Sequence, residues 1–239
     1  IEFIMSNPKY NKHVIGYHPT YQNTGEWFYQ NFRSKGVDYS RANKEAFQQW
    51  LQEKYDNDTA KLRQAWSDSD LNFTEVEIPE IPANLPGANV EKTLLDLPEQ
   101  KPVVDFYNFL SEIMVDRIIG ISKLIKDVTD DKSLVVQFYG YTMELPDPKS
   151  GHHDLKIILE CEDIDMLASP ISYYDRNEGG IGAFMAPVDS VQDNGKIWMV
   201  EDDTRTHRAE VEDNDAGFNP KIGKREDVLE AHKRNLGAI

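Results

Sequence analysis

The chain has 239 residues and a formal net charge of −16, from 42 acidic and 26 basic residues. This balance argues against binding to nucleic acid or to an anionic membrane surface, because both require clustered lysine and arginine side chains. A neutral partner such as a carbohydrate is compatible with the charge, and 11 tyrosines and 4 tryptophans are common where flat apolar ligands are held. The single cysteine, Cys161, excludes an intramolecular disulfide and is interpreted as a buried structural thiol.

The sequence leaves the cellular compartment undetermined. No run of about 18 apolar residues occurs, so no transmembrane helix is predicted. The first residues lack a basic segment followed by an apolar one, so no intact signal peptide is expected. The chain does not begin with Met, and we interpret it as a piece of a longer protein that is soluble and that could be secreted or periplasmic.

Strands and helices are predicted to alternate along the chain. Short apolar runs predict strands at 13–18, 134–139, 164–169 and 196–200. Helical spacing predicts helices at 40–55 with Ser40 as the cap, at 59–66 and at 103–128, followed by shorter ones near 152–161, near 188 and from about 224. Near-continuous apolar strands with helices between them indicate a parallel sheet covered on both faces.

The segment 67–102 interrupts this alternation. It is rich in Pro, Asp, Glu and Asn, and it contains five prolines between Pro79 and Pro102. Because proline removes a backbone donor and breaks regular structure, we predict an excursion over the surface here.

Polar and aromatic residues gather at the C-terminal end of each predicted strand. In a (β/α)8 barrel these strand ends build the active site, so the same bias in all four strands favours a site over four unrelated turns. The residues concerned are Tyr17, His18, Glu26 and Trp27 for the first strand, Tyr139, Gly140 and Tyr141 for the second, Ser169, Tyr173, Tyr174 and Arg176 for the third, and Glu201, Asp202 and Arg205 for the fourth.

Two carboxylates stand out within this set. Glu26 precedes Trp27, and Glu201 lies directly at a strand end. Glycoside hydrolysis uses two carboxylates, one to protonate the leaving oxygen and one to attack or to activate water. Spacing alone does not decide between this reading and a solvated turn or structural ion pair, because 42 acidic residues supply many candidate pairs.

Several motifs resemble the β-galactosidase-like glycoside hydrolases of family 42 and its relatives in the retaining clan of (β/α)8 barrels. The most recognisable is "SRANKEAFQQWLQEKY" followed by "LRQAW". The others are "VIGYHPTYQNTGEWFY", "FYGYTMEL", "IDMLASPISYYDRNEGGIGAFMAPVDSV" and "GKIWMVEDDTRTH", so that the resemblance spans about 14–205.

The resemblance implies a mechanism and a fold. It places the acid/base at Glu26 and the nucleophile at Glu201, with Asp202 as a competitor, and it departs from the family at Gly25, where an Asn usually precedes the Glu. The substrate-binding residues would be Tyr17, His18, Trp27, Tyr139, Tyr173, Arg176, Asp202 and Arg205. The four strands would be the fourth to seventh of the barrel, so 1–239 would form a single partial catalytic domain whose open sheet edges favour a homo-oligomer.

Neither a metal nor a cofactor is implied. The adjacent His152 and His153 lack partners with ligand spacing, and a capping role or a sugar contact fits them better than zinc. The acidic run around Asp213 lacks the full pattern of a calcium loop and is interpreted as a solvated loop. Two alternatives to an enzyme remain: a non-catalytic carbohydrate-binding remnant, and a subunit of a larger barrel protein.

Overall fold

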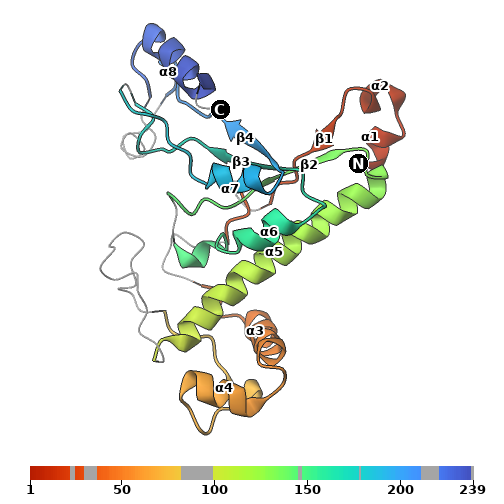
Figure 1. Ribbon diagram of the computed structural model, residues 1–239, viewed down its shortest axis with the longest axis vertical. Coiled ribbons are helices and arrows are strands. Elements are labelled where there is room, and N and C mark those ends of the chain that lie inside the picture. The colour runs from red at the N-terminus through yellow and green to blue at the C-terminus, as the bar shows by residue number, and fades with distance from the viewer. Residues whose placement is uncertain are drawn as a thin grey trace. The chain divides into compact units, whose positions relative to one another are not determined.

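The computed structural model describes residues 1–21, 25–29, 37–81, 99–144, 147–177, 179–210 and 221–237. The chain divides into two compact units (Figure 1). The first comprises Ile1–Thr20, Ile119–Leu145 and Leu155–Ile239, and the second comprises Tyr21–Ile118 and Pro146–Asp154. The long helix α5 (Lys101–Thr129) contributes to both units. That 1–239 is one catalytic domain stays a prediction.

The first unit contains a four-stranded parallel sheet with the order β1-β2-β3-β4. Its strands are β1 (Gly16–Tyr17), β2 (Leu134–Phe138), β3 (Met166–Pro170) and β4 (Ile197–Glu201). All four predicted strands are therefore confirmed, although β1 is much shorter than expected and β4 extends to include Glu201. Because the strands are parallel, their C-terminal ends meet at one edge of the sheet.

Buried polar contacts attach α5 to this sheet. The Lys126 ammonium is 2.8 Å from Asp165 Oδ2, and the same oxygen accepts a hydrogen bond from the main-chain N–H of Val135 at 2.7 Å. The Gln137 amide on β2 donates to Ser122 Oγ on α5 at 2.8 Å, and both side chains are fully buried. These pairings satisfy polar groups that would be costly to bury alone, so they fix how the helix packs on the strands.

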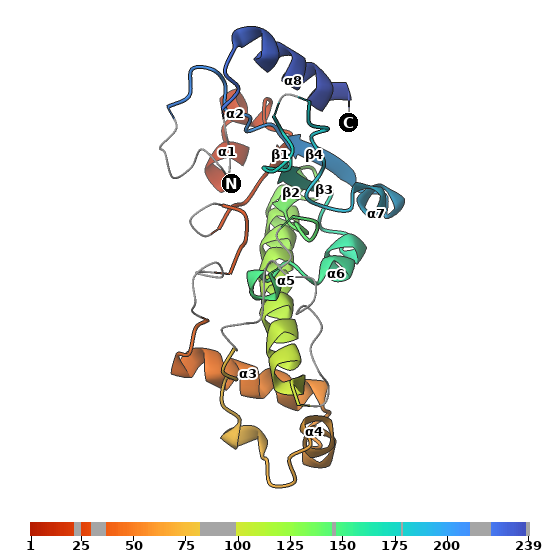
Figure 2. The same cartoon turned by 90° about the vertical axis from the view of Figure 1, so that its left-hand side faces the viewer.

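Five further helices belong to the first unit: α1 (Glu2–Met5), α2 (Pro8–Asn11), α6 (Leu155–Glu160), α7 (Val188–Asp193) and α8 (Arg225–Gly237). The last three are those expected from the sequence, and α7 lies beside β4 in both views (Figures 1 and 2). Helices α1 and α2 were not predicted. Helix α2 begins where Asn7 caps Lys9 N and Pro8 occupies a first-turn position that needs no N–H.

The second unit consists of α3 (Arg41–Lys54), α4 (Thr59–Trp66), the N-terminal part of α5, and two short 3₁₀ helices, η1 (Phe73–Glu75) and η3 (Pro148–Ser150). Ser40 caps α3 by accepting from Asn43 N at 3.3 Å, which confirms the predicted helix start. Asp58 caps α4 in the same way through Ala60 N. Caps encoded locally therefore define both helices.

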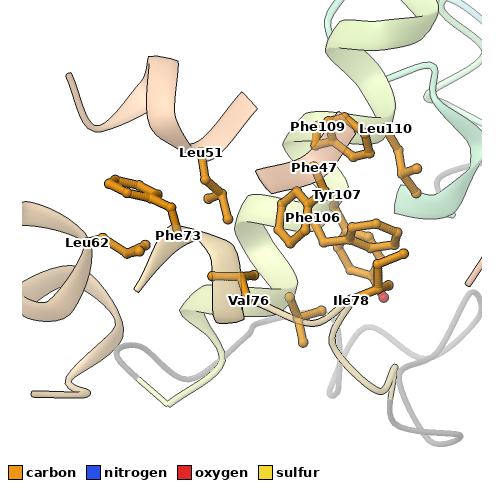
Figure 3. Packing of buried hydrophobic residues seen from close by; sticks show 11 residues of the cluster. Phe47, Leu51, Leu62, Phe73, Val76, Ile78, Phe106, Tyr107, Phe109 and Leu110 are labelled. Atoms are coloured by element: carbon orange, nitrogen blue, oxygen red, sulfur yellow. The ribbon is translucent and has the colours of Figure 1, made fainter. Parts of the chain in front are cut away.

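The core of the second unit shows that part of 67–102 is not a surface excursion. Phe73, Val76 and Ile78 are buried, because this extended segment crosses the helices and fills the space between them (Figure 3). Residues 82–98 lie outside the described part of the chain, and α5 begins at Lys101, slightly before the expected start. The cluster as a whole comprises Phe47, Leu51, Leu62, Phe73, Val76, Ile78, Val103, Phe106, Tyr107, Phe109 and Leu110.

A buried carboxylate ties the same helices together. Asp105 is fully buried on α5 and accepts hydrogen bonds from Tyr55 Oη at 2.6 Å and from Trp66 Nε1 at 2.8 Å. It also pairs with Lys54 at 3.1 Å and with Lys101. Burial raises the pKa of Asp105, but the hydrogen bonds and the two ammonium groups outweigh it and leave the pKa below its ordinary value. The carboxylate is therefore charged at neutral pH.

Candidate functional site

Three consecutive carboxylates form the C-terminal end of β4. Glu201 is the last residue of the strand and pairs in register with Pro170 on β3, while Asp202 and Asp203 follow directly. The sheet thus delivers Glu201 at the edge where all four strands end. The surroundings of the three carboxylates differ, and these differences separate their chemical roles.

Asp203 is bound by residues that follow β3. Arg176 Nη1 lies 2.5 Å from Asp203 Oδ1, and Tyr173 Oη donates to Asp203 Oδ2 at 2.9 Å. The Arg176 guanidinium stacks 4.1 Å above the Tyr173 ring and also donates to the main-chain oxygens of Ile171 and Ser172. Arg176 is 1% exposed, so its charge is held inside the protein by this set of acceptors.

Asp202 is bound by helix α8. Its Oδ2 atom lies 2.8 Å from His232 Nδ1 and accepts from Asn235 Nδ2 at 3.1 Å, while Oδ1 accepts from Thr204 N at 3.2 Å. Burial raises the pKa of Asp202, but the hydrogen bonds from Thr204, Asn235 and His232 prevail and lower it to about 2. Asp202 is therefore a fixed anion that anchors a helix.

Glu201 is the carboxylate left available. It is half-buried, and within the described part of the chain its carboxylate has no hydrogen-bond partner. Partial burial and the nearby negative charge of Asp203 raise its pKa, while Arg176 acts in the opposite direction. A carboxylate with a free pair of oxygens at a strand end can attack an electrophilic carbon or accept a proton.

The ends of β1 and β2 contribute aromatic and imidazole groups. The His18 ring packs against Phe138 with centroids 4.2 Å apart, and burial lowers the pKa of His18. Among the described residues, the Tyr17 hydroxyl and His18 Nε2 are both buried without a hydrogen-bond partner. Such buried polar atoms are costly unless paired, so both are available to a polar ligand. Tyr139, the other aromatic residue predicted here, is fully buried.

Glu26 belongs to the second unit and lies in a tight turn. It is half-buried between two residues with positive φ, Gly25 at 79° and Trp27 at 59°. Glycine adopts positive φ without the steric cost of a Cβ atom, so Gly25 suits this turn. Trp27 is 3% exposed and stacks on Tyr21 at 5.5 Å. A tryptophan in the left-handed region is strained.

His152 holds this turn in place. It is fully buried, its Nε2 lies 3.0 Å from the main-chain oxygen of Glu26, and its ring stacks on Phe28 at 4.3 Å. Burial, with a smaller effect of His153, lowers the pKa of His152 to about 3, despite main-chain hydrogen bonds to Glu26 and Trp27. From the sequence, His152 was expected to cap a helix or to contact sugar. The contact with Glu26 joins residues far apart in the chain, and no local pattern encodes it.

The predicted site residues thus occupy three groups. Tyr173 and Arg176 lie with the carboxylates of β4, Tyr17 and His18 lie beside β2, and Glu26 and Trp27 lie on the turn held by His152. Arg205 is half-buried beyond β4, and its main-chain oxygen accepts from Ile222 N at 3.0 Å. Sequence reasoning missed Asp203, His232 and Asn235. Asp203 carries a visible signal, since it is the third acidic residue in succession at a strand end.

The described residues contain no group of three or more His, Cys, Asp or Glu side chains arranged to hold a metal ion. The acidic run around Asp213 lies outside these residues. None of the described helices is both long and apolar enough to cross a membrane.

Comparison with known proteins identifies one family. The family model of glycoside hydrolase family 42, described as beta-galactosidase, matches residues 26–204, which is most of the chain. No curated protein matches the chain. The matched region begins at Glu26 and extends past Glu201 and Asp203, so it includes both predicted carboxylates.

Proposed function

Because the chain belongs to glycoside hydrolase family 42, the β-galactosidase family, we propose that it hydrolyses β-galactoside-like O-glycosidic bonds by a retaining mechanism. Such a mechanism needs one carboxylate that attacks the sugar and another that alternates between acid and base. The observation that carries the proposal is Glu201, a half-buried carboxylate at the strand-end edge with no hydrogen-bond partner among the described residues.

We assign the nucleophile to Glu201 rather than to Asp202. The Asp202 carboxylate is occupied by Asn235, His232 and Thr204, and these hydrogen bonds would have to break before it could attack a sugar. Asp203 is occupied by Arg176 and Tyr173 in the same way. Among the three carboxylates, Glu201 alone can approach an anomeric carbon without first losing bound donors.

We assign the acid/base to Glu26. Glu26 follows Gly25 and precedes Trp27, whose backbone is strained. Strained backbone conformations are common in active sites. A fully buried histidine contacts the main-chain oxygen of Glu26 and so supports the backbone that carries this side chain. A general acid needs this kind of support, because small displacements of a catalytic group cost much of its rate effect.

The reaction would proceed in two steps. In the first, a Glu201 oxygen bonds to the anomeric carbon while the bond from that carbon to the leaving oxygen breaks, and Glu26 gives its proton to that oxygen. In the second, a water molecule attacks the anomeric carbon and gives its proton to Glu26, and the bond to Glu201 breaks. The product keeps its anomeric configuration, and Glu26 regains its proton.

The sugar would be held by the remaining residues at the strand ends. Tyr17 Oη and His18 Nε2 are buried with no hydrogen-bond partner in the described part of the chain, and each could bind a hydroxyl group. The proposed binding set is Tyr17, His18, Trp27, Tyr139, Tyr173, Arg176, Asp202 and Arg205. Of these, Arg176 and Asp202 would act through the carboxylates and loops that they fix, and no metal or cofactor enters the mechanism.

We further propose that the parallel sheet is part of a (β/α)8 barrel and represents its fourth to seventh strands. The two outer strands of the described sheet, β1 and β4, each pair on one side only. Exposed strand edges favour pairing with another strand, so we expect copies of this chain to associate. Sedimentation velocity over a range of concentrations tests this, and a monomer at every concentration would contradict it.

The function is tested by hydrolysis of a panel of nitrophenyl glycosides, with the β-galactoside first. Glu201→Ala and Glu26→Ala are compared with Glu45→Gln, an exposed residue on α3 that serves as the control. We expect either catalytic change to lower kcat by at least a hundredfold, since each carboxylate contributes on the order of 10² or more, and the control to match the unaltered chain.

A 2-deoxy-2-fluoro glycoside provides a second readout, because it forms the covalent glycosyl-enzyme but releases it slowly. Mass spectrometry should find the label on Glu201 and find none in Glu201→Ala. A folded chain that binds galactosides but neither hydrolyses nor takes up label would be a carbohydrate-binding protein. A label on Asp202 would overturn the assignment of the nucleophile.

A further inference from the structure

Helix α8 makes polar contacts with the loop after β3 and with the segment after β4 that carries the carboxylates. Arg234 donates to the main-chain oxygens of Arg176 at 3.1 Å, Asn177 at 3.1 Å and Gly180 at 2.9 Å. His232 and Asn235 bind the Asp202 carboxylate, which immediately follows β4. One helix therefore fixes the loop after β3 and the segment after β4.

The Asn235 amide is oriented by its neighbours. Its Oδ1 atom accepts from Arg234 Nε at 3.0 Å and from Nη2 at 2.9 Å, so its Nδ2 atom is directed to the other side. There Nδ2 donates to Asp202 Oδ2 at 3.1 Å and approaches Thr204 Oγ1 at 3.4 Å. Asn235 is 4% exposed, while its acceptor Asp202 is partly exposed. The buried amide thus makes hydrogen bonds through both its oxygen and its nitrogen, and these bonds join α8 to the segment after β4.

Each carboxylate beside Glu201 is held by a different element. Asp203 is bound by Arg176 and Tyr173, and Asp202 is bound by α8. Burial and the charge of Asp203 raise the pKa of Glu201, and the charge of Arg176 lowers it. The titratable and charged groups around the two residues are Asp203 on the same segment, Tyr173 and Arg176 after β3, and His232 on α8.

We propose that His232 and Asn235 are positioning residues of the active site, which hold Asp202 against α8 and thereby keep its charge away from Glu201. This inference rests on the proposed function, in which Glu201 is the nucleophile. Adjacent residues at a strand end project in different directions, and the clamp on Asp202 preserves that divergence where β4 has ended. Without the clamp, Asp202 can turn toward Glu201, and a second like charge disfavours the ionised form that attacks.

The test follows the Glu201 carboxyl by carbon-13 NMR titration, with Glu201→Gln used to assign the signal. His232→Ala removes an exposed partner, and Asn235→Ala removes the buried one. We expect the titration midpoint of Glu201 to rise by roughly 0.5 to 1 pH unit in each, the effect of one unit charge a few ångströms away in a partly solvated site. Leu236→Ala, on an exposed neighbour in α8, is the matched control and should leave the midpoint unchanged.

A double substitution separates this role from a merely structural one. Adding Asp202→Asn removes the released charge, so Asn235→Ala with Asp202→Asn should return the midpoint to that of the unaltered chain. Loss of helix packing alone would lower the melting temperature without this dependence on Asp202. If the midpoint is unmoved in His232→Ala and Asn235→Ala while both stay folded, the proposal is overturned.

The titration does not require catalysis, so it distinguishes the two claims. Midpoints that move as expected in a chain that hydrolyses nothing would support the clamp and refute the proposed function. Hydrolysis by Glu201 with unmoved midpoints would support the function and refute the clamp. In an active chain, the acid limb of the kcat/KM profile should shift in the same direction as the midpoint.

Discussion

His152 Nε2 lies 3.0 Å from the main-chain oxygen of Glu26, so a buried imidazole fixes the turn that carries the proposed acid/base. Because its pKa is lowered to about 3 by burial, His152 is neutral at neutral pH. To donate to the Glu26 carbonyl, the neutral ring must carry its proton on Nε2. The ring thus orients the turn through hydrogen bonding and stacking, without a charge of its own.

His152→Ala should lower kcat by about tenfold to a hundredfold, because displacing a catalytic group by about 1 Å costs up to 10²-fold. The loss should be larger for alkyl galactosides than for dinitrophenyl galactosides, since good leaving groups need little help from an acid. His153→Ala is the control, because His153 is exposed and its Nε2 atom contacts the main-chain oxygen of Asp147. Equal losses on both substrates would indicate a general loss of folded enzyme instead.

His152 should also make stability depend on pH. Its pKa is about 3 when folded and near 6.5 when unfolded, so the unfolded chain takes up a proton first as pH falls. The contribution to stability is full above about 6.5 and decreases toward pH 3, by at most ~1.4 kcal/mol per pH unit. Urea unfolding between pH 4 and 7 measures this slope. His152→Gln cannot titrate and should have a smaller slope, and an unchanged slope would contradict the assignment.

Asp105→Asn should destabilise the chain by about 1–3 kcal/mol, because it removes a fully buried charged acceptor from Tyr55 and Trp66 and the counter-charge of the partly exposed Lys54 and Lys101. Asp127→Asn is a matched control on the same helix, where the pair with Lys123 is exposed to solvent and should contribute little to stability. Chemical denaturation measures both. A small loss of stability in Asp105→Asn would mean that the hydrogen bonds from Tyr55 and Trp66, rather than the negative charge, account for the stabilising effect of this residue.

The Asp105 contribution should disappear only in acid. The folded-state pKa of Asp105 lies below the ordinary value, so its stabilisation is present above the ordinary carboxylate range and is lost as pH falls through the lower folded value. The difference in stability between the unaltered chain and Asp105→Asn should therefore narrow below about pH 4, at a lower pH than the His152 effect.

Arg176→Gln should move the acid limb of kcat/KM to higher pH. Arg176 lowers the pKa of Glu201, and the same change frees Asp203, whose negative charge raises it. The nucleophile must be ionised, so activity is lost as pH falls through the pKa of Glu201. A higher pKa therefore causes this loss at a higher pH. Tyr173→Phe removes one hydrogen bond to Asp203 and should give a smaller shift. A shift to lower pH after Arg176→Gln would refute this account.

Local signals in the sequence account for most of the elements. The Ser40 cap and apolar spacing define α3, and the short apolar runs ending in Phe138, Pro170 and Glu201 define three strands. The prediction that 67–102 lies on the surface was wrong for Phe73, Val76 and Ile78, which are buried. The nearby prolines indicate irregular backbone, but whether irregular backbone is buried depends on what packs against it. A high density of prolines predicts that no helix forms, but it does not predict whether the side chains are buried.

The candidate site was predictable in its chemistry but only partly in its arrangement. Glu201 could be chosen because it ends a strand, which is a local property. The contacts of Asp202 with His232 and Asn235 could not be predicted, because they join residues that are 30 and 33 positions apart in the sequence. The contact between His152 and Glu26 depends in the same way on packing between distant segments.

The two-residue strand β1 has a consequence for the order in which the chain folds. Gly16 and Tyr17 pair with Leu134 and Val135, so α3, α4 and all of α5 intervene in sequence before the pair can close. A Cβ at Gly16 would lie 2.6 Å from the Leu134 carbonyl oxygen, so the pairing also tolerates no side chain there. Closing a long loop costs entropy before its few contacts repay it. We expect β2, β3 and β4 to assemble first and β1 to join last.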